Sequence, residues 1–443
     1  MGRLFRLTKK HPKTSASASR TAASSSVSGF TFIDNSQGAS AATAELSDAL
    51  GTALDQIDLD GPNPVDRLRI LFPELDTEAS KYTNSKISDA DIANYQCNIS
   101  QETAQLISAT WTCALATYTQ TSSSASKIPD STYHSFAPDH ITSPSPGGTF
   151  KAMATHLVSS ASSPTHSSEI KSRFFPALVI AIRGTASTVD GIVNLNGEPR
   201  DARKFLNSST AVSAHSGFLN DARALSEIIE QRIRSAGQTT ENLIFTGHSA
   251  GGAVATLLFL RFRAALLGTE RKVSCVTFGA PPCVSGVLEA EEEDGTERGV
   301  HLNIVNEFDM VSRIDGPYIL SMVNLLRSMR GLDGLELLPE KDGDQDEFGL
   351  KGVSTWSSED TRVGSCVEGG FWRFPPPRYS HVGKVVVLVT RLEGEKQEEV
   401  VTRTLELPRE VLEGLLFCRL EVHKRITYAE RVKMLEDDKV HGW

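Results

Sequence analysis

The stretch NLIFTGHSAGGAVATLLFL, residues 242–260, places a serine between two apolar segments. The first segment predicts a buried strand, and the second predicts a helix with small residues on the side that faces a sheet. Gly247 and Gly251 flank Ser249 at the two positions that a sharp strand-to-helix turn crowds. Such a turn lifts the serine side chain clear of its neighbours. We interpret the stretch as a nucleophile elbow; the alternative is a glycine turn with an idle serine.

Four other apolar runs predict buried strands, and they occur at 174–185, 272–282, 300–309 and 383–390. They alternate with helical patterns, and their side chains do not alternate between polar and apolar. This is typical of a mostly parallel sheet covered by helices on both faces, in an α/β fold. Apolar residues at three- and four-residue spacings predict further helices between residues 64 and 120.

The remaining segments define the expected domain boundaries. Residues 1–60 form a basic tail rich in Ser and Ala, which we expect to be disordered. Residues 61–395 form the α/β domain, with acidic inserts at 289–299 and 338–349 that are typical of solvated loops. Neither insert has the spacing of an EF-hand loop, so we expect no metal site. Residues 396–443 are expected to form a helical C-terminal extension.

Charge and hydropathy exclude several classes of protein. The 45 Lys and Arg residues against 55 Asp and Glu residues give a net charge of −10, which argues against a nucleic-acid binder. No apolar run reaches the roughly 18 residues of a transmembrane helix. The N-terminal segment lacks the apolar core of a secretory signal, so we expect an intracellular, cytoplasmic protein. Its Arg, Lys and Ser content leaves organelle targeting as the alternative, and secretion is disfavoured.

A nucleophilic serine needs a general base, and that base needs an acid to orient it. In this type of fold the acid and then the histidine follow the serine along the chain. Asp309 ends the strand HLNIVNEFD, at the sheet edge where active sites collect. Asp315 lies past that strand in a DGP turn, and Asp294 lies in an acidic run. We therefore predict that Asp309 is the acid, with a turn-forming role as the alternative.

Three histidines follow Asp309. His381 lies in PRYSHVGK, on a loop directly before a predicted strand. His423 lies in the predicted helical tail and His441 at the end of the chain, so either would need the tail to fold over the site. The placement favours His381 as the base.

An oxyanion hole needs two hydrogen-bond donors. One is the backbone N–H of Ala250, directly after the nucleophile, and the other comes from the loop after an early strand. VIAIRGTAS provides that strand and loop, and Thr185 offers both its N–H and its hydroxyl. This chemistry requires no metal and no organic cofactor.

Six motifs then resemble the fungal-type class 3 lipases of the α/β-hydrolase fold: IRGTAS, AHSGFL, TGHSAGGAVATL, TFGAPP, NEFDMVSRI and YSHVGK. They appear in the family's order and cover roughly residues 90–390. The resemblance implies Ser249 as nucleophile, Asp309 as acid, His381 as base, and Thr185 with Ala250 as the oxyanion hole.

The resemblance also implies a lid between the oxyanion loop and the His-Ser-Gly-Phe motif. Its apolar residues would be Ile192, Val193 and Leu195, covering the site and opening at a lipid surface. Family members often carry a tryptophan where Gly191 stands, so its absence argues against strong interfacial activation.

The predicted function is hydrolysis of glycerolipid carboxylic esters, as in a triacylglycerol lipase, through a Ser-Asp-His triad and an acyl-enzyme. The expected partners are an acylglycerol or other lipid ester and, transiently, a lipid surface. Two alternatives remain: a phospholipase or mono- or diacylglycerol lipase of the same mechanism, and a catalytically silent scaffold that binds lipid.

Overall fold

The structure is a computed structural model, and it describes residues 64–119, 128–143, 151–161, 172–184, 197–235, 241–286, 299–331, 366–367, 370–393 and 399–436. The predicted N-terminal tail, the acidic insert 338–349 and nearly all of the insert 289–299 lie outside these ranges.

An eight-stranded sheet forms the centre of the fold, in the order β1-β2-β3-β6-β7-β9-β12-β13. Its five middle strands, from β3 to β12, run parallel, and the strands at both edges pair antiparallel. The strands are β1 (His134–Thr142), β2 (Met153–Ser160), β3 (Ala177–Ile182), β6 (Asn242–His248), β7 (Lys272–Phe278), β9 (His301–Asn306), β12 (Lys384–Glu393) and β13 (Glu399–Leu407). The prediction of a mostly parallel sheet is confirmed, since the predicted strands form its parallel centre.

Two small sheets lie beside the central one. One contains β4 (Pro199–Asp201), β5 (Val212–His215) and β8 (Val284–Gly286), and the other contains β10 (Cys366–Val367) and β11 (Phe371–Trp372). The helices are α2 (Pro64–Ala79), α3 (Asp89–Tyr95), α4 (Gln101–Thr119), α6 (Arg203–Leu206), α7 (Ser216–Ser235), α8 (Ala250–Ala265), α9 (Gly316–Met329), α10 (Arg409–Glu413) and α11 (Arg425–Glu436). Short 3-10 helices cover Thr83–Ser85, Met310–Arg313 and Glu421–His423.

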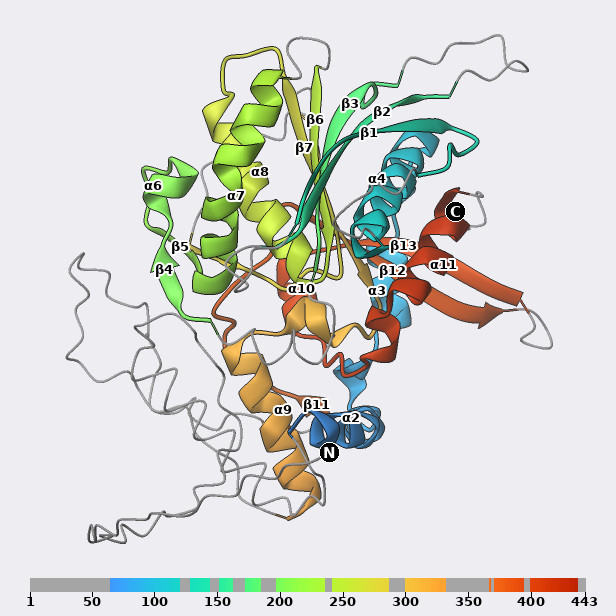
Figure 1. The fold of residues 1–443 in the computed structure, drawn as a ribbon. Coiled ribbons are helices and arrows are strands. Elements are labelled where there is room, and N and C mark those ends of the chain that lie inside the picture. The colour runs from blue at the N-terminus through green and yellow to red at the C-terminus, as the bar shows by residue number, and fades with distance from the viewer. Residues whose placement is uncertain are drawn as a thin grey trace, which may run out of the picture.

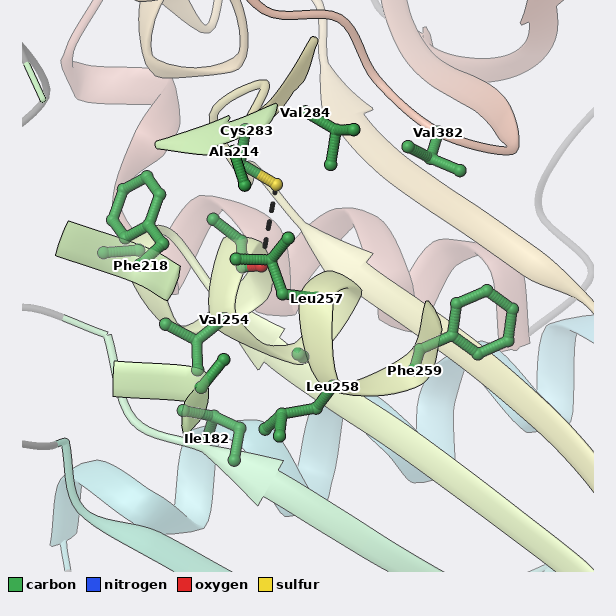
Figure 2. Close-up of a cluster of buried hydrophobic side chains, with 14 of the residues drawn as sticks. Ile182, Ala214, Phe218, Val254, Leu257, Leu258, Phe259, Cys283, Val284 and Val382 are labelled. Atoms are coloured by element: carbon green, nitrogen blue, oxygen red, sulfur yellow. Dashed lines mark hydrogen bonds between the residues drawn. The ribbon is translucent and has the colours of Figure 1, made fainter. Parts of the chain in front are cut away.

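Helices cover both faces of the central sheet. Helices α7 and α8 lie on one face, and α4 and α11 lie on the other (Figure 1). Figure 2 shows the core under α8, where Val254, Leu257 and Leu258 gather near Ile182 of β3. The Sγ of Cys283 donates a hydrogen bond of 3.6 Å to the carbonyl of Ala253 in the same helix. This packing fixes the helix that begins directly after Ser249.

The C-terminal extension differs from the prediction. Residues 399–407 were expected to be helical, but they form β13, which pairs along its length with β12 at the sheet edge. Val and Thr are frequent in this stretch and favour a strand, and pairing with β12 gives its backbone hydrogen-bond partners. After β13 the chain turns back, and residues 409–436 bring α10 and α11 against the domain. The extension is therefore part of the domain.

Candidate active site

Ser249 lies at a turn whose backbone conformation is rare for a residue with a side chain. Its φ of 59° and ψ of −136° place it outside the helix that follows, and its N–H donates to the carbonyl of Phe278 on β7. A non-glycine residue keeps such a conformation only where the surrounding structure imposes it, and such sites are often functional. The strand β6 and the helix α8 meet here, as the elbow interpretation requires.

The two flanking glycines are required by close backbone contacts. A Cβ on Gly247 would lie 2.5 Å from the carbonyl carbon of Gly251. A Cβ on Gly251 would lie 2.3 Å from the carbonyl oxygen of Ile182. Both separations are too short for any side chain, so α8 can begin this close to β3 only with glycine at these positions.

Asp309 is fully buried just beyond the carboxyl end of β9, and three donors surround its carboxylate. Its Oδ1 accepts from the N–H of Val311 at 2.9 Å. Its Oδ2 accepts from the hydroxyl of Tyr428 at 2.7 Å and from Nδ1 of His423 at 2.8 Å. The carboxylate is held in place by the chain's own donors and points its Oδ2 at an imidazole.

That imidazole belongs to His423, at the end of the 3-10 helix Glu421–His423. The side chain is 1% exposed, and its Nε2 has no hydrogen-bond partner among the described residues. An ionised carboxylate only accepts, so Nδ1 of His423 carries the proton and Nε2 has a free lone pair. A buried imidazole of this kind, with one nitrogen fixed by a carboxylate and the other open, can take a proton from a neighbour.

His423 lies against the elbow itself. Its ring stacks on the ring of His248, the residue before Ser249, with centroids 4.6 Å apart. The Nε2–H of His248 donates to the carbonyl of His423 at 3.0 Å. A Cβ placed on Gly279, the residue after Phe278, would meet Oδ2 of Asp309 at 2.8 Å and Nδ1 of His423 at 2.9 Å. Elbow, carboxylate and imidazole therefore converge at one place.

The prediction that His381 is the base is wrong on this geometry. The Nε2–H of His381 donates to the carbonyl of Ser312 at 2.7 Å, and the ring is buried there. Burial lowers the pKa of His381 to about 4. Because the protonated Nε2 of His381 donates a hydrogen bond to this carbonyl, it cannot accept the proton of a serine hydroxyl. His381 instead ties the loop before β12 to the 3-10 helix after Asp309.

The other candidates are also placed by the structure. Asp315 caps α9 through the N–H of Tyr318 at 2.9 Å, and it accepts from the N–H of Arg378 at 2.5 Å. It therefore has a structural role. Asp294 and His441 lie outside the described residues.

Ala250 is the first residue of α8, where a backbone N–H has no partner within the helix, so its donor faces the serine side of the turn. Thr185 and the lid residues Ile192, Val193 and Leu195 lie outside the described residues. The last described residue before that gap, Gly184, lies against the elbow: its Cβ would be 3.3 Å from Cβ of Ser249.

The described residues contain no cluster of three His, Cys, Asp or Glu side chains that could hold a metal ion. Among the described helices, none is both long enough and apolar enough to cross a bilayer.

A family model for Lipase (class 3) matches residues 179–318. The matched segment begins in β3, contains Ser249 and Asp309, and ends in α9. This segment of the chain is similar to the class 3 lipase family, and the match supports a serine ester hydrolase with the elbow serine inside the matched segment. His423 lies outside the match, so only its contacts connect it with the site.

Several solved lipases are similar to this chain. The Rhizomucor miehei lipase propeptide complex is 15% identical with a TM-score of 0.40, and the alignment covers 71% of this chain and 75% of that one. The nonglycosylated Yarrowia lipolytica LIP2 lipase is 15% identical with a TM-score of 0.45, covering 75% and 96%. A lipase from Rhizopus microsporus var. chinensis is 13% identical with a TM-score of 0.35, covering 75% and 86%. The similarity to the class 3 lipase family depends on the sequence match over residues 179–318.

Proposed function

We propose that the protein hydrolyses carboxylic esters of glycerolipids with Ser249 as nucleophile, His423 as general base and Asp309 as the acid that orients it. The observation that carries this proposal is the buried Asp309–His423 pair at 2.8 Å, with the His423 ring stacked on His248, directly before Ser249, and its Nε2 without a partner among the described residues. The lipase family match supports a lipid ester as the substrate.

In the first half of the reaction Ser249 attacks the acyl carbonyl, and Nε2 of His423 accepts the hydroxyl proton. Asp309 holds the imidazole in the tautomer that exposes Nε2 and stabilises the imidazolium that forms. The imidazolium then gives its proton to the leaving alcohol, and an acyl-enzyme remains. Water attacks the acyl-enzyme in the second half with His423 again as base, and the fatty acid leaves.

The developing oxyanion would be bound by the N–H of Ala250 and by a donor from the loop that follows Gly184, where we assign Thr185. Removing one such donor costs about 10²–10³ in kcat in well-studied hydrolases. The apolar residues Ile192, Val193 and Leu195 remain our assignment for a lid that contacts a lipid surface transiently.

Two other functions are compatible with the fold. A phospholipase or a mono- or diacylglycerol lipase would use the same mechanism, and side-by-side turnover of tri-, di- and monoacylglycerols and phospholipids separates them. A silent lipid-binding scaffold would lack turnover altogether. The paired Asp309 and His423 favour an enzyme, because a buried, hydrogen-bonded carboxylate and imidazole are not needed to bind lipid.

Labelling with a fluorophosphonate probe and turnover of a nitrophenyl ester test the proposal together. We expect Ser249→Ala to abolish both while the far-UV spectrum and melting temperature stay close to those of the parent. Ser235→Ala, an exposed serine at the end of α7, is the matched control and should keep full activity. Retention of more than a few per cent of the parent rate by Ser249→Ala would contradict the assignment.

A further inference from the structure

Two arginine side chains lie over one tyrosine ring beside the active site. The guanidinium carbon of Arg425 is 4.2 Å from the ring centroid of Tyr118, and that of Arg183 is 5.7 Å from it. Arg183 directly follows β3, Arg425 is the first residue of α11, and Tyr118 is near the end of α4. Three segments far apart in sequence thus bring two positive charges to one place.

This arginine pair adjoins the reacting serine. Tyr118 Oη donates to Nδ1 of His248 at 3.2 Å, one residue before Ser249. The Cβ position of Gly184 would be 2.2 Å from Oη of Tyr118 and 3.3 Å from Cβ of Ser249, so both side chains flank the same glycine. Arg425 also follows His423 by two residues. The tyrosine ring therefore carries its two cations at the edge of the site.

The charge here is not balanced within the described part of the chain. The ion pairs found among the described residues include neither Arg183 nor Arg425. The Arg183 charge also helps to lower the pKa of the Lys151 ammonium, so a third cation is near. Among the described residues Lys151 pairs with the carboxylate of Asp221, at 3.9 Å. Positive charge thus gathers at the site of a protein whose net charge is −10.

Two guanidinium groups this close to one ring centroid attract an anion to the same place. Guanidinium groups match the oxygens of phosphate with paired hydrogen bonds. In a glycerophospholipid the phosphate is attached to the same glycerol unit as the ester, so it lies close to the bond that Ser249 would attack. Neutral acylglycerols offer no group of this charge.

Resting on the proposed function, we propose that Arg425 and Arg183 bind the phosphate of a lipid headgroup. The substrates preferred by this enzyme are then glycerophospholipids with an anionic headgroup. Tyr118 is a positioning residue in this site, since it holds both cations beside the elbow.

The test compares two soluble esters that differ only in the phosphate, dihexanoyl phosphatidate and dihexanoylglycerol, below the concentrations at which either aggregates. Without a lipid surface, only binding at the site can distinguish them. We expect the parent to have the higher kcat/KM on phosphatidate. Arg425→Gln should lower the phosphatidate-to-dihexanoylglycerol ratio of kcat/KM about tenfold, through KM, as expected for the loss of a charge-assisted contact.

Two further variants test whether the effect depends on the guanidinium group and whether loss of any positive charge from α11 would cause it. Arg425→Lys should restore part of the ratio, because a point charge remains without the paired donors. Lys433→Gln, which removes an exposed positive charge from the same helix, should leave the ratio unchanged. Inorganic phosphate should inhibit the parent more strongly than Arg425→Gln if the site binds the phosphate group.

An equal effect of Arg425→Gln on both esters would overturn the headgroup site and leave only a structural role for the arginine. Inhibition by inorganic phosphate without preference for phosphatidate would also overturn it, because the site would then bind a free anion. Absence of any Ser249-dependent ester hydrolysis would instead contradict the proposed function, and the headgroup site with it.

Discussion

If His423 is the general base and His381 has a structural role, replacing each with alanine should have different effects. The change at His423 should abolish activity, and the change at His381 should lower stability. His423→Ala removes the imidazole that contacts Asp309, and loss of a triad histidine lowers kcat by about 10⁴-fold or more. His381→Ala removes a buried hydrogen bond to the carbonyl of Ser312 and leaves that carbonyl unpaired. The triad contacts are unchanged, so the folded fraction should turn over at close to the parent rate.

The cost of His381→Ala should therefore appear as lost stability. An orphaned buried carbonyl costs about 1–3 kcal/mol, and the cavity left by the ring adds to that. In a domain of this size each kcal/mol corresponds to roughly 2–4 °C in Tm, so we expect a loss of several degrees.

The assay is the single-turnover rate on a nitrophenyl ester, divided by the folded fraction from the far-UV signal, with Tm measured on the same samples. Performing it well below the Tm of the weaker variant separates lost folding from lost chemistry. An inactive but folded His381→Ala, together with an active His423→Ala, would refute the triad and restore the assignment made from the sequence.

Three other perturbations test the surroundings of the site. Tyr428→Phe removes the hydroxyl that donates to Asp309 at 2.7 Å. We expect kcat to fall about tenfold with little change in KM, because the lost charge-assisted bond orients the triad. An unchanged kcat would show that the contacts from Val311 and His423 are enough to hold the carboxylate. Gly251→Ala should lower the free energy of unfolding by more than about 1–3 kcal/mol, because its Cβ has no room beside β3. The control is Gly414→Ala, whose Cβ would meet no atom closer than 3.5 Å, and it should leave the melting temperature nearly unchanged. Stability should fall as pH drops from about 6.5 to about 4, since burial lowers the pKa of six described histidines and the unfolded chain then binds more protons; each contributes a slope of up to about 1.4 kcal/mol per pH unit. Three carboxyls whose pKa burial raises oppose this trend: Asp221, to about 6, Asp315 and Glu413. Urea denaturation across this range measures the slope, and a flat profile would contradict the expectation. The histidines are His134, His140, His156, His248, His301 and His381.

The local structure around Ser249 and Asp309 agrees with the sequence because it is encoded locally. A buried strand, a glycine turn and a helix with small residues follow one another within residues 242–260, so neighbouring residues determine the conformation of the turn. Gly247 and Gly251 were expected because of backbone crowding, and the structure shows the contacts that cause it. The position of Asp309 at the end of β9 follows in the same way, since a strand and the residue after it are also local features.

The proposed base, His423, could not be predicted in this way, because its position depends on the path of the chain after β12. His381 was favoured since it precedes a strand, and His423 was set aside as part of an appended helix. The stretch EVVTRTLEL at 399–407 held the missing signal, because β-branched residues dominate it. As strand β13 it extends the sheet next to β12, and the following chain must then return toward the carboxyl edge, where it reaches Asp309.

The returning segment is fixed to the site by several backbone contacts. Arg419 N–H donates to the carbonyl of Phe308 at 3.0 Å, and the side-chain amide of Asn306 donates to the carbonyl of Val422 at 2.8 Å. Residues 423–428 then carry the proposed base, the proposed headgroup arginine and the tyrosine that donates to Asp309. Ser249 and Asp309 lie outside this segment, whereas the imidazole that contacts Asp309 lies within it. If His423 is the base, proton transfer requires the C-terminal chain to be docked, and the extension is then part of the active site.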